Sequence, residues 1–285
     1  MDATLQQQGK NKKRLICMCD SKYPPILRHK NYEHASVFTA ENLLREAKRQ
    51  KNIADHKVPP ICLLDPDGDI VQNLRAEKRA SINPYWACYH TKMYIFQYGA
   101  IEFGIIGYAV GSSFSVLVAE ELFASGCQLL ISMSSAGQIV KKRKPPYFIL
   151  IEKALRDEGT SYHYLPASDY STINPELRDI LSDAFIQFSL PLDQGVCWTT
   201  DAPFRETASS IEYFRSLGIL AVEMEAAALY AFGEASDKPV ICFAHVTNQM
   251  GSIEGDFEKG PVNGGNDAVQ LIYVAAKAWM DWKPK

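Results

Sequence analysis

Short apolar segments alternate with segments of helical spacing from residue 58 onward. The apolar segments read VPPICLLD, MYIFQYG, FGIIGYAV, QLLISM, YFILIEKAL, QGVCWTT, GILAVE and PVICFAHVT. The helical segments read SVLVAEELFASG, NPELRDILSDAFIQF, MEAAALYAFGEA and NDAVQLIYVAAKAW. Continuous apolar strands are typical of sheets that are covered on both faces. The pattern therefore predicts an α/β fold in one large domain, with a central mixed β-sheet flanked by helices on both faces.

The first 57 residues follow a different pattern, because they are polar and basic. They contain KNKKR, a KYPPIL segment that disfavours helix, and ENLLREAKRQKN. The last of these has helical spacing, which places Leu43, Leu44 and Ala47 on one face. We therefore expect an N-terminal extension at residues 1–57 and a single domain at residues 58–285.

Composition and charge favour a small-molecule partner. The chain has 285 residues, of which 47% are hydrophobic, and a net charge of −3. Because this charge gives the protein no broad positive field, neither nucleic acid nor an anionic membrane is expected as its principal partner. The uncharged run from Phe103 to Ala119 approaches the length of a membrane span, but it holds three glycines and three serines. It predicts a strand, a Gly/Ser turn and a buried helix.

Cysteine usage indicates a reduced, cytoplasmic protein. The seven cysteines are scattered, mostly in apolar contexts, without a paired C-x-x-C spacing. The N-terminus lacks a cationic region followed by a long apolar region. Cys17 and Cys19 form a lone C-x-C with no second ligand pair at a metal-binding spacing nearby, so no metal site is predicted.

Two carboxylates, Glu223 and Glu225, lie inside the apolar run AVEMEAAALYAF, at a junction between a predicted strand and a predicted helix. Sites in α/β sheets form from the loops beyond the strand ends. One interpretation is a helix start, where the dipole favours acids by about 0.3–1 kcal/mol. The other is a carboxylate beside a pocket that accepts hydrogen bonds from adjacent hydroxyls, such as a ribose 2′,3′-diol. We expect backbone donors at the strand end to satisfy Glu223.

The segment VEMEAAALYAF resembles the ribose-binding segment of the family-one nucleoside phosphorylases, which include purine nucleoside phosphorylases, uridine phosphorylases and nucleosidases. Three further blocks follow the family's order: AVGSSFSVLVAEELFASGCQLLISMSSAGQI, ALRDEGTSYHYLP and WTTDAPF. The resemblance covers residues 58–282. It implies a nucleoside phosphorylase-like catalytic domain, cleavage of the N-glycosidic bond of a nucleoside, and a homo-oligomer. It implies no cofactor, with inorganic phosphate as a candidate co-substrate.

The resemblance also implies roles for individual residues. Glu225 would bind the ribose hydroxyls while Met224 packs on the sugar. Trp198 would stack on the base, a contact worth about 0.5–1.5 kcal/mol beyond its buried area, although a core tryptophan is the alternative. Phe204 would line the base pocket. Asn248 takes the place of the acid that protonates a purine, and an amide can donate and accept hydrogen bonds but cannot act as a general acid.

The chain departs from the family where phosphate is bound. In LDPDGD, Leu64 and Gly68 occupy the positions of a glycine and a phosphate-binding arginine. In SMSSAG, Ser132 replaces the second arginine, whereas Ser135 keeps a hydroxyl position. Because guanidinium geometry matches phosphate, losing two arginines weakens a dianion site. Ser134, Ser135 and Gly68 are therefore expected to form a pocket for phosphate or for water.

Three functions remain open at this point. Cleavage with phosphate follows the family, hydrolysis follows from the missing arginines, and binding of a nucleoside without turnover is the third. Asn248, in HVTNQMGS, is similar to the residue of enzymes that act on 6-oxopurine or uracil nucleosides. Because APFRET, after Asp201, lacks the Gln-x-Arg pair by which uridine phosphorylases bind uracil, the predicted base is purine-leaning, with uridine as the other option. DPDGD is not a calcium loop, because its glycine falls at the fourth position instead of the sixth.

Overall fold

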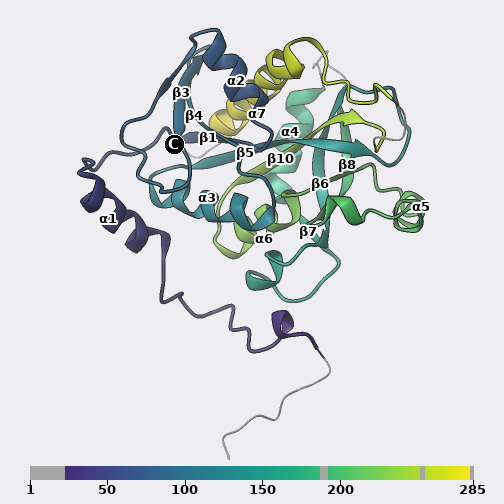
Figure 1. Ribbon diagram of the computed structural model, residues 1–285, viewed down its shortest axis with the longest axis horizontal. Helices are drawn as coiled ribbons and strands as arrows, with labels where there is room; N and C mark the ends of the chain where they lie inside the picture. Colours follow the sequence, from purple (N-terminus) through teal and green to yellow (C-terminus); the bar gives the residue numbers. More distant parts are fainter. Residues whose placement is uncertain (1–22, 187–191, 251–253, 283–285) are drawn as a thin grey trace, which may run out of the picture.

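The computed structural model describes residues 23–186, 192–250 and 254–282, and it confirms the predicted α/β fold with a large mixed sheet (Figure 1). Ten strands form this sheet: β1 (Ile61–Asp65), β2 (Ala80–Ile82), β3 (Met93–Tyr98), β4 (Ile101–Gly107), β5 (Leu129–Gln138), β6 (Tyr147–Asp157), β7 (Tyr170–Thr172), β8 (Leu192–Thr200), β9 (Ala221–Glu223) and β10 (Val240–Asn248).

Part of the sheet closes on itself. The strand order is β10-β6-β8-β9-β5-β1-β4-β3-β2, with β7 added to β6, and β10 also pairs with β5. Strands β5, β10, β6, β8 and β9 therefore form a ring. Since β1 is parallel to both β4 and β5, and β5 is parallel to β10, the carboxyl ends of these four strands lie at one edge. Ligand sites of α/β proteins form at such an edge.

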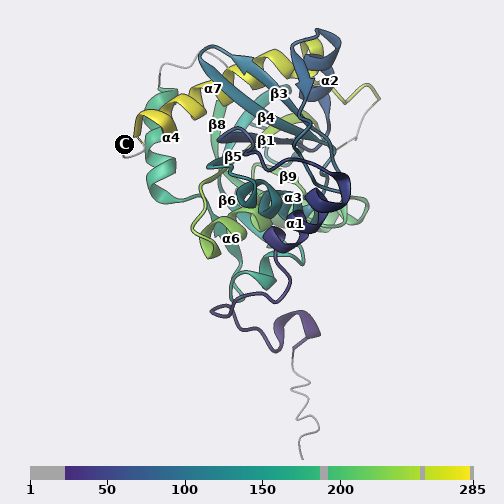
Figure 2. The ribbon, with the colours of Figure 1, turned by 90° about the vertical axis from the view of Figure 1, so that its left-hand side faces the viewer.

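Helices cover both faces of the sheet. They are α1 (Ala40–Lys51), α2 (Asp69–Ala76), α3 (Ser112–Ala124), α4 (Pro175–Phe185), α5 (Ala208–Ser216), α6 (Ala226–Ala235) and α7 (Gly265–Trp282), with short 3₁₀ turns η1 (Pro25–Leu27), η2 (Ser161–His163), η3 (Pro203–Arg205) and η4 (Pro261–Gly264). Helix α3 packs against α1 and α6, and α7 packs against α2 and α4. Figure 2 shows these two groups on opposite sides of the strands.

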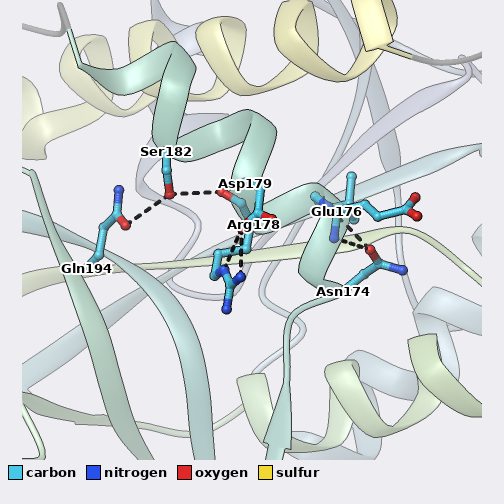
Figure 3. Close-up of polar contacts among 7 residues, drawn as sticks. Asn174, Glu176, Arg178, Asp179, Ser182 and Gln194 are labelled. Carbon is cyan, nitrogen blue, oxygen red and sulfur yellow. Dashed lines mark hydrogen bonds and ion pairs between the residues drawn. The ribbon is translucent and has the colours of Figure 1, made fainter.

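Helix α4 shows how local sequence fixes an element. Its first residue is a proline, and the Asn174 side chain accepts hydrogen bonds from the backbone N–H groups of Glu176 and Leu177 at 2.9 and 3.2 Å (Figure 3). Both features are typical of helix starts. The Ser182 hydroxyl also contacts Gln194 of β8 at 3.2 Å, which ties the helix to the sheet.

The uncharged run 103–119 forms most of β4, a Gly-containing turn and the first part of α3, as its pattern predicts. Among the described residues, no helix is long and apolar enough to cross a membrane.

Helix α1 forms where the ENLLREAKRQKN spacing predicts it. The Thr39 hydroxyl caps its start by accepting from the backbone N–H of Asn42 at 3.3 Å. Leu44 and Ala47 are buried against Ala87, on the side that faces α3. The extension therefore contributes one helix to the packed structure.

Candidate active site

Glu225 lies at the point where α3 and α6 begin. Its side chain is 2% exposed, and its Oε1 accepts the backbone N–H of Gly111 at 2.7 Å. The Ser112 hydroxyl donates to the carbonyl of Met224 at 2.8 Å, which holds the two helix starts together. Burial, followed by the charge of Glu223, raises the pKa of Glu225 to about 8. A carboxyl group with few donors and a raised pKa is available to bind a ligand.

Glu223 has a different role, and the prediction of backbone donors is confirmed. Its Oε2 accepts the N–H groups of Glu225 and Ala226 at 2.7 and 2.8 Å, while the Thr199 hydroxyl donates to Oε1. The side chain thereby joins the end of β9 to α6 and β8. Because these bonds occupy the oxygens of Glu223, Glu225 is the member of the pair that remains available to a ligand.

The DPDGD loop between β1 and α2 holds three aspartates, two of which have structural partners. Asp65 accepts the backbone N–H of Val71, in the first turn of α2, at 2.8 Å. Burial raises the pKa of Asp65 to about 7. Asp69 pairs with the ammonium of Lys259 and accepts the Asn263 amide at 3.1 Å. These contacts join the loop to the segment before α7.

Asp67, the third aspartate, points toward β5. Its Oδ2 accepts the backbone N–H of Ser135 at 2.8 Å. The charge of Asp67 also contributes to the raised pKa of Glu225, which means that the two carboxyl groups interact electrostatically. Ser134 and Ser135 line a small hollow with these groups, whose lining includes Asp65, Asp67, Asp69, Ser134, Ser135 and His245. The two predicted serines thus have the acidic DPDGD loop as their neighbour.

Gly68 lies beside this hollow in a left-handed conformation that favours glycine. Its φ is +80°, and a Cβ placed there would lie 2.1 Å from the ring of Tyr108. Gly68 therefore allows Tyr108, which is 52% exposed, to cover the loop that carries Asp67.

We expect Gly68→Ala to lower the free energy of unfolding by about 2–4 kcal/mol, because backbone strain adds to overlap with Tyr108. Gly218 is a matched control, since it has a φ of +77° and open space around its Cβ position. Gly218→Ala should show only the strain, about 1–2 kcal/mol. Urea unfolding of both variants measures the difference, and equal losses would contradict the contact with Tyr108.

Asn248 ends β10 opposite Gly137 of β5, where the register shifts. Its Oδ1 accepts the backbone N–H of Met250 at 2.9 Å, and its Nδ2 donates to the Thr247 hydroxyl at 3.2 Å. These bonds fix the amide so that its second N–H is the group left for a ligand. A Cβ at Gly137 would lie 2.5 Å from the sulfur of Met250, so glycine is needed for this close approach.

His245 was not singled out by its sequence pattern. It lies within β10, 6% exposed, and its ring stacks on Phe148 with 4.6 Å between centroids. Burial and then the charge of Lys259 lower its pKa to about 4, so the imidazole is neutral at physiological pH. In the described parts of the chain, no group of three His, Cys, Asp or Glu side chains is arranged to hold a metal ion.

Comparison with known proteins decides the family. A family model described as the phosphorylase superfamily matches residues 60–270, which hold Asp67, Ser135, Glu225 and Asn248. The chain belongs to the phosphorylase superfamily. The candidate active site of this superfamily member thus lies at the ends of strands β1, β5, β9 and β10 and at the start of α3.

Two curated proteins are similar to this chain over part of their length. The uncharacterized protein R802 of Acanthamoeba polyphaga mimivirus is 30% identical over 62% of this chain and 66% of its own length. A DeoD-type purine nucleoside phosphorylase of Bacillus cereus is 31% identical over 41% of this chain and 51% of its own. The chain therefore matches about half to two thirds of these relatives.

Solved structures of the superfamily share the fold. AMP nucleosidase from Bacteroides thetaiotaomicron matches with a TM-score of 0.66 and 20% identity, covering 85% of this chain and 98% of its own. Uridine phosphorylase from Vibrio fischeri, in complex with 6-hydroxy-1-naphthoic acid, matches with a TM-score of 0.62 and 17% identity, covering 81% and 93%. At these identities the likeness establishes the fold alone.

The two aromatic residues assigned to the base differ in their surroundings. Trp198 is 3% exposed, donates its indole N–H to Asp157 at 2.9 Å and lies 4.5 Å from the ring of Phe214. It occupies a hydrophobic cluster with Ile219, which is the alternative its sequence left open. Phe204, in η3, is 99% exposed. Both base contacts stay predictions.

Proposed function

We propose that the protein hydrolyses the N-glycosidic bond of a purine-leaning ribonucleoside, releasing the base and free ribose. The observation that carries this proposal is the 2.8 Å hydrogen bond from the Ser135 backbone to Asp67. By resemblance, Ser135 belongs to the phosphate pocket. The carboxylate of Asp67 on this donor repels a phosphate dianion and favours water.

Each reacting group then has a candidate residue. Glu225 fixes the ribose hydroxyls, because its buried carboxyl retains acceptor positions beyond the Gly111 bond. Asn248 donates its remaining N–H to the base, where negative charge develops as the C1′–N bond breaks. Water forms the new bond to C1′, and Asp67 accepts one of its protons. The departing base regains a proton from solvent.

Phosphorolysis remains the reaction implied by the sequence resemblance, and nucleoside binding without turnover is the third option. The Lys259 ammonium lies beside the DPDGD loop, but it is paired with Asp69. That ion pair leaves it poorly placed to bind phosphate as well, so hydrolysis is the better supported reaction. The purine preference is supported by the DeoD-type relatives, which match 41% of the chain.

The test is release of free base from inosine, guanosine, adenosine, methylthioadenosine and uridine, with and without phosphate. We expect a purine nucleoside to give free base and ribose at the same rate in both conditions. Release that depends on phosphate, with ribose 1-phosphate as product, would contradict hydrolysis. Saturable binding without release would establish a binding protein instead.

A further inference from the structure

The hollow beside the DPDGD loop has room for one water molecule. Its volume is about 10 Å³, at the lower limit for a single buried water, which needs about 10–15 Å³ and about 2–4 polar partners. Asp67, Ser134, Ser135 and His245 line the hollow and offer such partners. In the proposed hydrolysis Asp67 accepts one proton of the attacking water. The second hydrogen of that water needs an acceptor of its own, and the proposed mechanism has not yet assigned one.

His245 reaches the hollow from β10, on the side opposite to Asp67. In the parallel pairing of β10 with β5, His245 is the partner of Ser135, so the two side chains point to the same face of the sheet. Strand β5 lies between β1 and β10. Because Asp67 follows β1 and accepts the Ser135 N–H at 2.8 Å, Asp67 and His245 flank Ser135 from its two sides. A water molecule beside Ser135 would lie between the carboxylate and the imidazole.

The imidazole of His245 is held in one place and is kept neutral. It is 6% exposed, and Gly264 packs so closely on the ring that a Cβ there would lie 2.4 Å from Cε1. Burial and then the charge of Lys259 lower the pKa of His245 to about 4, although the charges of Asp67 and Asp69 act in the opposite direction. A neutral imidazole keeps one nitrogen that accepts a hydrogen bond, which an imidazolium lacks.

We propose that His245 is a further catalytic residue, whose imidazole accepts a hydrogen bond from the attacking water while Asp67 takes the other proton of that water. The inference rests on the proposed hydrolysis, of which this water is the nucleophile. The water oxygen forms the bond to C1′, the C1′–N bond breaks, and its electron pair leaves with the base. The imidazole stays neutral, because the proton goes to Asp67. Fixing both hydrogens orients the water before it attacks, so less entropy is lost at the transition state.

The test compares base release by the wild type with that by His245→Phe, His245→Asn and His245→Gln. Phenylalanine keeps a ring that can stack on Phe148 but has no acceptor. Its kcat should fall by about 10²-fold and its KM change by less than about twofold, because Glu225 and Asn248 are the groups assigned to the nucleoside. Asparagine places an amide near the position of Nδ1 and glutamine near that of Nε2. One of these two variants should recover about tenfold or more of the lost rate.

His56→Phe is the matched control. His56 also stacks on an aromatic ring, Tyr85, with 4.0 Å between centroids, but it is exposed and lies outside the hollow. Its kcat should equal that of the wild type. Thermal unfolding of each variant separates a loss of rate from a loss of folding.

The outcomes distinguish the two proposals. Absence of base release from the wild type, or release that requires phosphate, overturns the hydrolysis and the role of His245 with it. Hydrolysis by the wild type with an unchanged kcat in His245→Phe overturns the role of His245 alone, and the serine hydroxyls would then hold the second hydrogen. Equal losses in the Phe, Asn and Gln variants would also contradict an acceptor at this position.

A measurement without any substitution covers the case in which the variants fail to fold. Nitrogen-15 NMR of histidine-labelled wild type should show the His245 ring neutral from pH 5 to pH 8, with Lys259, Asp67 and Asp69 as the charged groups that act on it. A ring that carries a charge at pH 7 would overturn the proposal, because an imidazolium has no nitrogen left to accept a hydrogen bond from water.

Discussion

Replacing Asp67 by asparagine is expected to lower kcat for base release by about 10²–10⁴-fold, the range typical of a lost general base. The substitution is nearly isosteric, and the amide oxygen can still accept the Ser135 N–H. Folding should therefore be retained while proton acceptance from water is lost. Steady-state base release measures the effect, and Asp183→Asn, at an exposed position of α4, is the matched control.

The same variant has a second readout, because the charge of Asp67 contributes to the raised pKa of Glu225. Removing that charge should move the Glu225 limb of the pH–rate profile to lower pH. Asp67→Gly should in addition regain activity when formate is supplied as a base. An unchanged kcat in Asp67→Asn, with no shift of the pH profile, would rule out Asp67 as the group that activates water.

Glu225→Gln is expected to lower kcat/KM by about 10²-fold or more, because the carboxylate that grips the ribose diol strengthens its bonds as the ribosyl group becomes cationic. The same change should stabilise the free protein at pH 8. The folded-state pKa of Glu225 is about 8, against an ordinary value of 4.5. Between these values the folded state binds the proton more tightly than the unfolded chain does, so stability falls as pH rises through this window.

Glutamine cannot ionise, so the variant should lose this fall in stability. A shift of this size corresponds to a few kcal/mol, at 1.36 kcal/mol per pKa unit. Urea unfolding at pH 5 and pH 8 measures it for the wild type, Glu225→Gln and the exposed control Glu102→Gln. Asp65, with a pKa of about 7, adds a fall of the same sign in all three proteins. A wild-type kcat/KM in Glu225→Gln would contradict a role of Glu225 in binding the ribose. An unchanged pH dependence of the free energy of unfolding would show that the pKa of Glu225 is not raised.

The larger elements could be predicted from sequence because their apolar patterns reflect burial. Strand β10, for example, is buried at every position, and its apolar run predicts it directly. Helices α2 and α5 were not predicted. Helix α2 begins after Gly68 in a loop dominated by acids, and the apolar face of α5 is limited to Ile211 and Phe214, which are only partly buried. Strands β2 and β7 are only three residues long and give little pattern.

The candidate site could be predicted only in part, because its decisive contacts are long-range. The carboxylate pair at β9 was visible as acids in an apolar run, and the backbone donors to Glu223 followed from its place at a strand end. The bond between Asp67 and Ser135 joins residues 68 positions apart, and that between Glu225 and Gly111 spans 114. No local spacing reveals such pairs. The first follows from the parallel pairing of β1 with β5, whereas the second joins the residues that follow β4 and β9.

The closed ring of strands also limits how copies of this chain can associate. Because β5, β10, β6, β8 and β9 pair with one another around the ring, the long strands that carry the site offer little free backbone. In the described sheet, the outermost strands β2 and β7 are three residues each. Such short edges are poor templates for adding a strand from a neighbour. Self-association would therefore depend on side chains of helices and loops.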